Sequence, residues 1–147
     1  MNQDAVQCAP EAVVAEQATR RPLIAIFNSS ADTVDLLRRA CEEDGFQTVT
    51  GHIPEIKQGG LDFIAFIAHH NPSVIVYDVS PPYEGNWTFL KLVRSSEAVT
   101  GKPFVITTTN KPALDGLVGG TEAIEIIGKP YDLKRVVDAV RSALPPS

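Results

Sequence analysis

Three residues whose side chains could do chemistry, Asp78, Thr108 and Lys129, each stand at or just after the end of a short apolar segment. In open parallel sheets, ligands bind outside the carboxyl ends of the strands. If these segments are neighbouring parallel strands, a carboxylate, a hydroxyl and an ammonium group meet in one crevice. Each residue taken alone has an ordinary explanation, because Asp forms turns, Thr bonds locally and Lys is usually solvated. Their joint placement is what indicates a functional site.

Short apolar segments alternate with amphipathic segments from residue 21 onward. The nearly continuous Val, Ile, Leu and Phe of most of these segments are typical of parallel strands covered by helices on both faces, while the second segment alternates more and suits an edge. The pattern predicts a doubly wound α/β fold. The expected strands are residues 23–27, 46–50, 74–77, 104–108 and 123–127, and the expected helices are residues 31–43, 61–70, 86–95, 112–118 and 132–144.

Length and charge limit the classes of protein. The 147 residues, 44% hydrophobic and 21% charged, fit one globular domain. We expect residues 1–20 to be a flexible extension, because they show no sustained apolar face, and residues 21–147 to form the domain. With 13 Lys and Arg against 18 Asp and Glu, the formal charge is -5. The chain therefore lacks the basic excess of proteins that bind nucleic acid.

No segment predicts a membrane span or secretion. The longest apolar run, residues 63–68, is far shorter than the roughly 20 residues that cross a bilayer. The amino terminus has neither the basic residues nor the apolar stretch of a secretory signal. We expect a cytoplasmic protein in which Cys8 and Cys41 are free thiols.

The order and spacing of the segments resemble the receiver domains of two-component response regulators over residues 21–145. Residues 74–78 are similar to the family's third strand, which ends in the phosphoacceptor aspartate, and Pro82 follows four residues later as in the family. Residues 103–108 are similar to the strand that ends in the switch Ser or Thr, and residues 129–132 resemble the Lys-Pro-aromatic signature. The resemblance implies a CheY-like five-stranded parallel sheet with the strand order 2-1-3-4-5.

The resemblance also implies a chemistry. Asp78 would accept a phosphoryl group from a histidine kinase or phosphotransfer protein, forming an acyl phosphate. Lys129 would pair with the phosphoryl oxygens, and Thr108 would move inward to bond them and so change the surface that meets a downstream protein. The face formed by the fourth helix, fifth strand and fifth helix would be the docking or dimer surface. We expect a single-domain phosphoacceptor and not an enzyme.

The sequence departs from the family at the metal site. Receiver domains carry two acidic residues after the first strand, which hold Mg²⁺ together with the phosphoacceptor, but Asn28 and Ser29 occupy these positions. The charges of Asp78 and Lys129 already sum to zero, so a divalent cation has little left to neutralise. We therefore expect weak or absent Mg²⁺ binding, with Asp78 and Ser80 as the remaining ligands, and no other cofactor.

Two further departures concern the switch and the access to it. Ile126 stands where the family often has an aromatic residue that swings together with the Thr, so we expect that coupling to be absent. Thr109 stands where the family usually has a small Ala or Gly beside the phosphoryl group. This larger side chain predicts slow phosphorylation.

Three functions are compatible with these residues. The retained Asp78, Thr108 and Lys129 favour a phosphorylated receiver, whereas the missing acidic pair favours a degenerate receiver that acts as a phosphorylation-independent interaction module. A flavodoxin-like protein would instead use residues 28–33 as a cradle for FMN or phosphate. This segment lacks Gly, and Asp32 would repel a phosphate, so the third function has the least support.

Overall fold

The structure, a computed structural model, describes residues 21–119, 124–129 and 132–144. The expected extension, residues 1–20, lies outside the described residues, as do residues 130 and 131 of the Lys-Pro-aromatic signature and residue 123, the expected start of the fifth strand. The described strands are β1 (Leu23–Asn28), β2 (Gln47–His52), β3 (Val74–Val79), β4 (Phe104–Thr108) and β5 (Ile124–Gly128). The described helices are α2 (Ala31–Glu43), α3 (Ile53–Lys57), α4 (Phe63–His70), α5 (Tyr83–Arg94), α6 (Lys111–Val118) and α7 (Leu133–Ala143).

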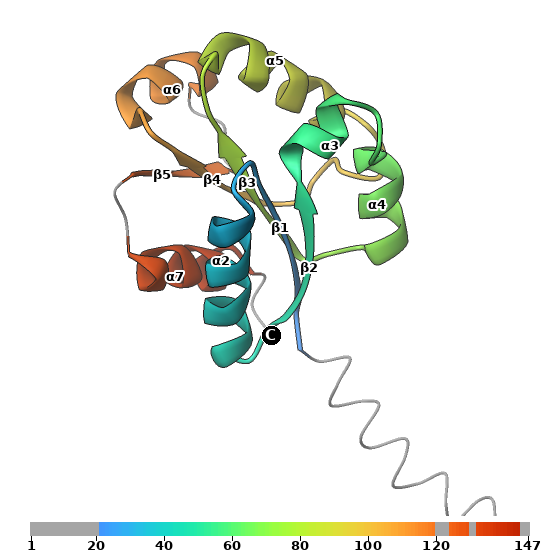
Figure 1. Cartoon of the computed structure of the whole chain (residues 1–147), viewed down its shortest axis with the longest axis vertical. Coiled ribbons are helices and arrows are strands. Elements are labelled where there is room, and N and C mark those ends of the chain that lie inside the picture. Colours follow the sequence, from blue (N-terminus) through green and yellow to red (C-terminus); the bar gives the residue numbers. More distant parts are fainter. Residues whose placement is uncertain (1–20, 120–123, 130–131, 145–147) are drawn as a thin grey trace, which may run out of the picture.

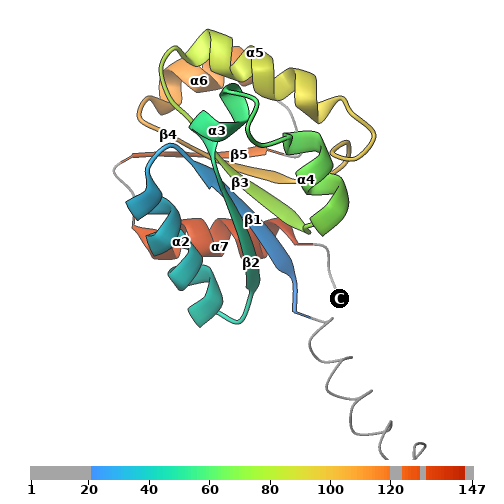
Figure 2. The same ribbon diagram turned by 45° about the vertical axis from the view of Figure 1, so that its right-hand side comes forward.

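The strands form one parallel sheet with the order β2-β1-β3-β4-β5. Helices α2 and α7 cover one side of this sheet, whereas α3, α4, α5 and α6 cover the other (Figure 1, Figure 2). The predicted doubly wound α/β fold and its strand order are therefore confirmed. The strand order reverses between β1 and β3, and ligands bind at this point in such sheets.

The sequence pattern does not predict α3, a helix of 5 residues after β2. A helix of fewer than two turns is too short to show an apolar repeat of 3.6 residues. Pro54 stands in its first turn, where the missing N–H removes no helical hydrogen bond, and Ile53 and Ile56 are buried. The next helix, α4, begins later than expected because the Asp62 side chain accepts a backbone N–H of its first turn and caps it.

The side chains of each central strand alternate between two apolar cores. On β3, Tyr77 and Val79 pack among helices α3 to α6, whereas Val74 and Val76 pack against α2 and α7. Successive side chains of a strand point to opposite faces of the sheet. Asp78 lies two residues beyond Val76, so its carboxylate projects towards the side of α2 and α7.

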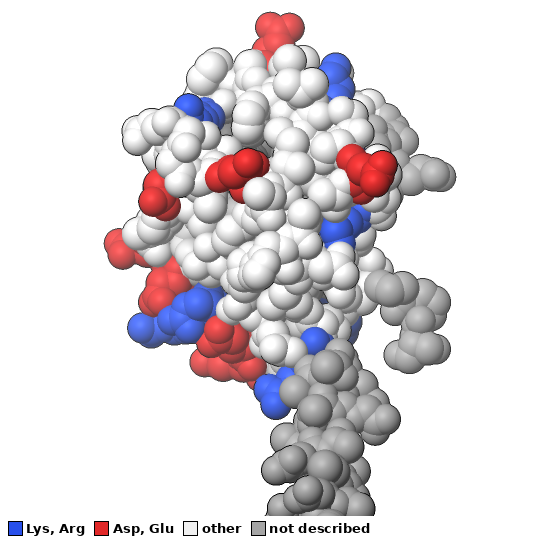
Figure 3. Space-filling model, turned by 90° about the vertical axis from the view of Figure 1, so that its right-hand side faces the viewer, with Lys and Arg blue, Asp and Glu red and all other residues white. Residues whose placement is uncertain are grey.

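Charged side chains are unevenly distributed over the surface. On α2, Arg38 forms ion pairs with Asp35 and Glu42, and on α7 Lys134 pairs with Asp138. The face turned to the viewer in Figure 3 has a broad uncharged area with scattered charged side chains around it. Among the described helices, none is long and apolar enough to span a bilayer.

Candidate functional site

Polar side chains gather where the central strands end, on the side of the sheet covered by α2 and α7. Asp78 lies near the end of β3 and pairs in register with Thr107 of β4. Asn28 is the last residue of β1, and Lys129 directly follows β5. Because Asn28, Asp78 and Thr107 are all buried, their polar groups are largely shielded from water and need partners from the protein or from a ligand.

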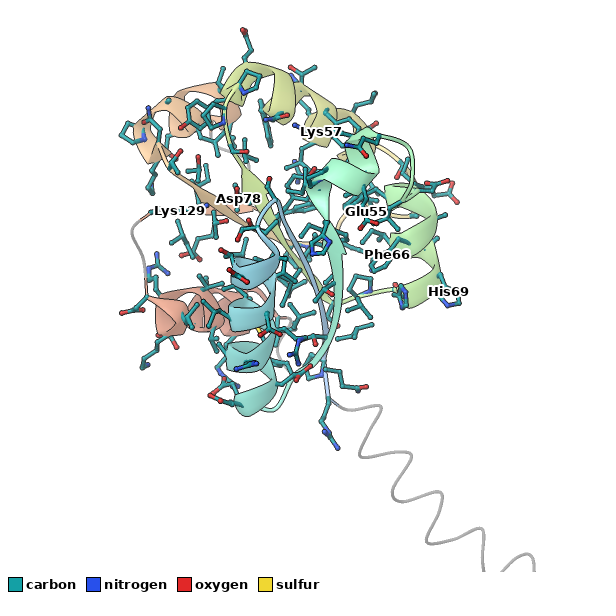
Figure 4. All side chains as sticks on the ribbon, in the orientation of Figure 1. Glu55, Lys57, Phe66, His69, Asp78 and Lys129 are labelled. Atoms are coloured by element: carbon teal, nitrogen blue, oxygen red, sulfur yellow. The ribbon has the colours of Figure 1, made fainter. Side chains whose placement is uncertain are left out.

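Asp78 and Lys129 form an ion pair at this edge of the sheet. The Nζ of Lys129 lies 2.9 Å from Oδ1 of Asp78, whose side chain is only 3% exposed. Figure 4 shows the two residues close together, near the carboxyl ends of β3 and β5. The backbone N–H of Lys129 donates to the carbonyl oxygen of Thr108 at 2.7 Å, which fixes the start of the loop after β5 against the end of β4. The sheet itself thus positions the ammonium group over the carboxylate.

The hydroxyl that contacts Asp78 belongs to Thr107 and not to Thr108. The Oγ1 of Thr107 donates to Oδ1 of Asp78 at 2.6 Å. Thr108 pairs in register with Val79, which packs among α3 to α6, and its Oγ1 accepts the backbone N–H of Asn110 at 3.4 Å. Sequence reasoning missed Thr107. Side chains alternate between the two faces along β4, so only one of the two adjacent threonines can face Asp78. This alternation is the sequence signal that could have identified Thr107.

Asn28 is held in one orientation by the first turn of α2. Its Oδ1 accepts the backbone N–H of Ser30 at 3.0 Å, and the Ser30 hydroxyl in turn caps α2 by accepting the backbone N–H of Thr33 at 3.2 Å. The buried Nδ2 of Asn28 has no hydrogen-bond partner within the described part of the chain. A buried amide donor without an acceptor is costly, so this atom is a candidate contact for a ligand. Ser29 beside it is exposed.

The loops after β3 and β4 are tied together beside Asp78. The Tyr83 hydroxyl, at the start of α5, lies 2.5 Å from the Thr109 hydroxyl, within hydrogen-bonding distance. The Asn86 side chain donates to the carbonyl oxygen of Ser80 at 2.5 Å and so holds the loop that follows β3. Ile126 is buried in the core beneath α3 to α6. These contacts restrict how far the rim of the site can move.

A surface groove along β5, α6 and α7 shares no lining residue with this site. It is lined by residues 71–73 and 101–104, which precede or begin β3 and β4, and by side chains of α6, β5 and α7. Arg135 and Glu125 form an ion pair of 2.8 Å within it. Asp78 stands at the opposite, carboxyl end of β3, where parallel sheets place their ligands.

Similarity to known proteins is found at the level of the fold. No protein-family model and no curated protein sequence matches the chain. Among solved structures, the chemotaxis response regulator CheY4 of Vibrio cholerae is similar with a TM-score of 0.65 and 18% identity over 84% of this chain and 99% of that chain. A signal receiver domain from Clostridium thermocellum has a TM-score of 0.68 and 17% identity over 85% and 98% of the two chains. The chain has the CheY-like receiver fold. The resemblance of the sequence to receiver domains is thus confirmed at the level of the fold.

The residues at this edge of the receiver fold do not fit a Mg²⁺ site. Magnesium requires oxygen ligands in near-octahedral geometry, and the described residues contain no group of three or more His, Cys, Asp or Glu that could hold a metal ion. Oδ1 of Asp78 already accepts from Lys129 and Thr107. Oδ1 of Asn28 is taken by the N–H of Ser30. What this site offers in excess is hydrogen-bond donors, which repel a cation.

Proposed function

We propose that the protein is an atypical single-domain response-regulator receiver that accepts a phosphoryl group on Asp78. The observation that carries this proposal is the contact of 2.9 Å between Nζ of Lys129 and Oδ1 of Asp78. In this contact, a cation lies where an incoming phosphoryl group would develop negative charge. Stabilising that charge is the principal requirement of phosphoryl transfer. The receiver fold supports the same role in two-component signalling.

In the proposed reaction, a carboxylate oxygen of Asp78 forms a bond to phosphorus while the phosphorus–nitrogen bond to a histidine of the donor breaks. The imidazole leaves with the bonding electron pair. Asp78 becomes a mixed anhydride that carries more negative charge than the carboxylate did. Lys129 then pairs with the phosphoryl oxygens. The chain acts as an acceptor and not as an enzyme, and its partners are a histidine kinase or phosphotransfer protein and a downstream protein.

The end of β4 is the element that would transmit the change. Thr107 bonds Asp78 directly, and the carbonyl oxygen of Thr108 holds the backbone of Lys129. A phosphoryl group between Asp78 and Lys129 would displace the hydroxyl of Thr107 from the carboxylate, and we propose that the end of β4 shifts in response. Because β4 leads into α6 and Lys129 follows β5, the displacement reaches the face of α6, β5 and α7. This face is the proposed surface for the downstream protein or a second copy of the chain.

A degenerate receiver that signals without phosphate is the second candidate. The side chain of Asp78 is only 3% exposed, and Tyr83 and Thr109 tie the loops beside it, so a donor has restricted access. The flavodoxin-like alternative receives less support, because the Ser30 hydroxyl in the proposed anion cradle is already engaged in capping α2. The low exposure of the Asp78 carboxylate is the observation that favours an interaction module over a phosphoacceptor.

Intact-mass measurement after incubation with acetyl phosphate or a phosphorylated kinase separates the two candidates. We expect the wild-type protein to gain the mass of one phosphoryl group and Asp78→Asn to gain none. An unchanged mass for both proteins, under conditions that label a receiver of known activity, would favour the interaction module.

A further inference from the structure

The starting observation is the buried amide of Asn28. The residue is 2% exposed, and its Nδ2 finds no acceptor among the described residues. The orientation of this amide is fixed, because a reversed side chain would bring its NH₂ group against the N–H of Ser30, which now donates to Oδ1 at 3.0 Å. The unpartnered atom is therefore a donor and not an acceptor.

The sheet register places this donor beside Asp78. Phe27 of β1 pairs with Tyr77 of β3, so the next residues, Asn28 and Asp78, are neighbours on adjacent strands. The residues two positions earlier on each strand pack in the core beneath α2 and α7. By the period of two, Asn28 and Asp78 project to that same side. Adjacent strands lie about 4.8 Å apart, so a group attached to Asp78 comes within reach of Asn28.

The donors around Asp78 complement an anion. The site contains the ammonium of Lys129, the hydroxyl of Thr107 and the amide of Asn28, and only one carboxylate. Phosphoryl oxygens accept hydrogen bonds, and charged groups form the stronger ones. The amide of Asn28 can thus donate directly to a phosphoryl oxygen. An acidic residue at the same position could interact with that oxygen only through a bound cation.

We infer that Asn28 is a phosphoryl-binding residue whose Nδ2 donates directly to the phosphoryl group on Asp78, so that Asp78 is phosphorylated without a divalent cation. This inference rests on the proposed function. With acetyl phosphate, a carboxylate oxygen of Asp78 bonds to phosphorus as the phosphorus–oxygen bond to acetate breaks. Acetate leaves with the electron pair, and the balance of the step needs no further reactant.

The test measures the rate of adduct formation by intact mass in EDTA and in Mg²⁺. We expect the wild-type rates in the two conditions to agree within about twofold. Asn28→Leu keeps the approximate volume and removes the donor, so we expect its rate in EDTA to fall at least about tenfold, as for a lost hydrogen bond to a charged group. Ser29→Ala, at the exposed neighbouring position, is the matched control and should retain the wild-type rate. A wild-type adduct that forms only in Mg²⁺, or an Asn28→Leu rate equal to the wild type, would overturn the inference and leave the proposed function intact.

Two further measurements keep the outcomes distinct. If Asn28→Leu does not fold, Asn28→Asp decides: we expect its adduct to require Mg²⁺, and an adduct of equal rate in EDTA would contradict the inference. If no protein forms an adduct under any condition, the proposed function fails. The melting temperature in EDTA with inorganic phosphate then decides the anion site, because phosphate should raise it for the wild type but not for a folded Asn28 variant. No rise for the wild type would overturn the assignment.

Discussion

The two faces of the sheet are built from the same strands but end differently at the carboxyl edge. On the side of α3 to α6, the core is aromatic, with the ring centroid of Phe27 4.9 Å from that of Phe63 and 5.9 Å from that of Tyr77. On the side of α2 and α7, the core is mainly aliphatic, with Phe46 as its aromatic residue among those described, and it gives way to the buried polar residues Asn28 and Asp78. The difference teaches that the alternation of side chains along a strand decides which residues can reach the carboxylate.

The first and largest prediction tests the aromatic face. Phe27 is fully buried and contacts three other rings. We expect Phe27→Ala to lower the free energy of unfolding by about 3–5 kcal/mol, because it removes buried apolar surface and leaves a cavity. Urea denaturation measures the change. Leu92→Ala on α5, where the side chain is 69% exposed, is the control and should stay within about 0.5 kcal/mol of the wild type. Equal effects of the two variants would contradict the assigned core.

The second prediction concerns the aliphatic face, where Cys41 of α2 is a buried free thiol. Burial raises the pKa of Cys41 to about 11, with smaller contributions from the nearby charges of Asp44 and Glu42. The folded state therefore holds this proton more tightly than the unfolded state does. The stability that Cys41 contributes is present below its ordinary pKa and is lost as the pH rises through about 11.

We expect a loss of about 2–3 kcal/mol over this range, from 1.36 kcal/mol for each unit of pKa difference. Urea denaturation between pH 8 and pH 11 measures it. Cys41→Ala should show a correspondingly flatter dependence on pH. A parallel decline in the two proteins would show that another group titrates.

The third prediction compares the adjacent threonines of β4. Thr107→Val removes a donor from a buried carboxylate, so we expect the free energy of unfolding to fall by about 1–3 kcal/mol. Thr108→Val removes only the acceptor of a long hydrogen bond of 3.4 Å, and we expect a loss below about 1 kcal/mol. Thermal and urea denaturation of both variants measure the difference. A larger loss for Thr108→Val would mean that the alternation of faces is misassigned.

The smallest effect is expected on the exposed surface of α7. Lys134 and Asp138 form an ion pair of 3.3 Å with both side chains largely exposed. Such pairs one helical turn apart contribute about 0.3–0.5 kcal/mol, so Lys134→Ala should change the free energy of unfolding by no more than this. Denaturation at low and high salt measures it, since the small effect should vanish in salt. A loss above 1 kcal/mol would show that charge on this side matters more than its exposure suggests.

The sequence was sufficient to predict the fold and the proximity of Asp78 and Lys129 at the ends of their strands. Runs of β-branched and aliphatic residues identified the buried strands, and the rule for parallel sheets placed Asp78 and Lys129 at one edge. The short helix α3 was missed because it has too few residues for a periodic pattern. Thr107 was missed because the resemblance to receiver domains drew attention to Thr108, while the partner of Asp78 depends on the register between β3 and β4.

The orientation of the Asn28 side-chain amide could not be predicted from the residue alone. An amide offers one acceptor and two donor hydrogens, and the N–H of Ser30 decides which end faces the site. That N–H is presented by the start of α2, whose position depends on packing against the sheet. The sequence showed that acidic residues were missing, but only the structure shows that a hydrogen-bond donor replaces them.

The position of the phosphoryl group tests the central claim most directly. Borohydride reduction of an acyl phosphate converts the modified aspartate to homoserine, which survives digestion and peptide mass mapping. After treatment with acetyl phosphate, we expect homoserine at position 78 and no conversion in Asp78→Asn. Conversion of another carboxyl residue, or none under conditions that convert a receiver of known activity, would contradict the assignment of Asp78 as the phosphoacceptor.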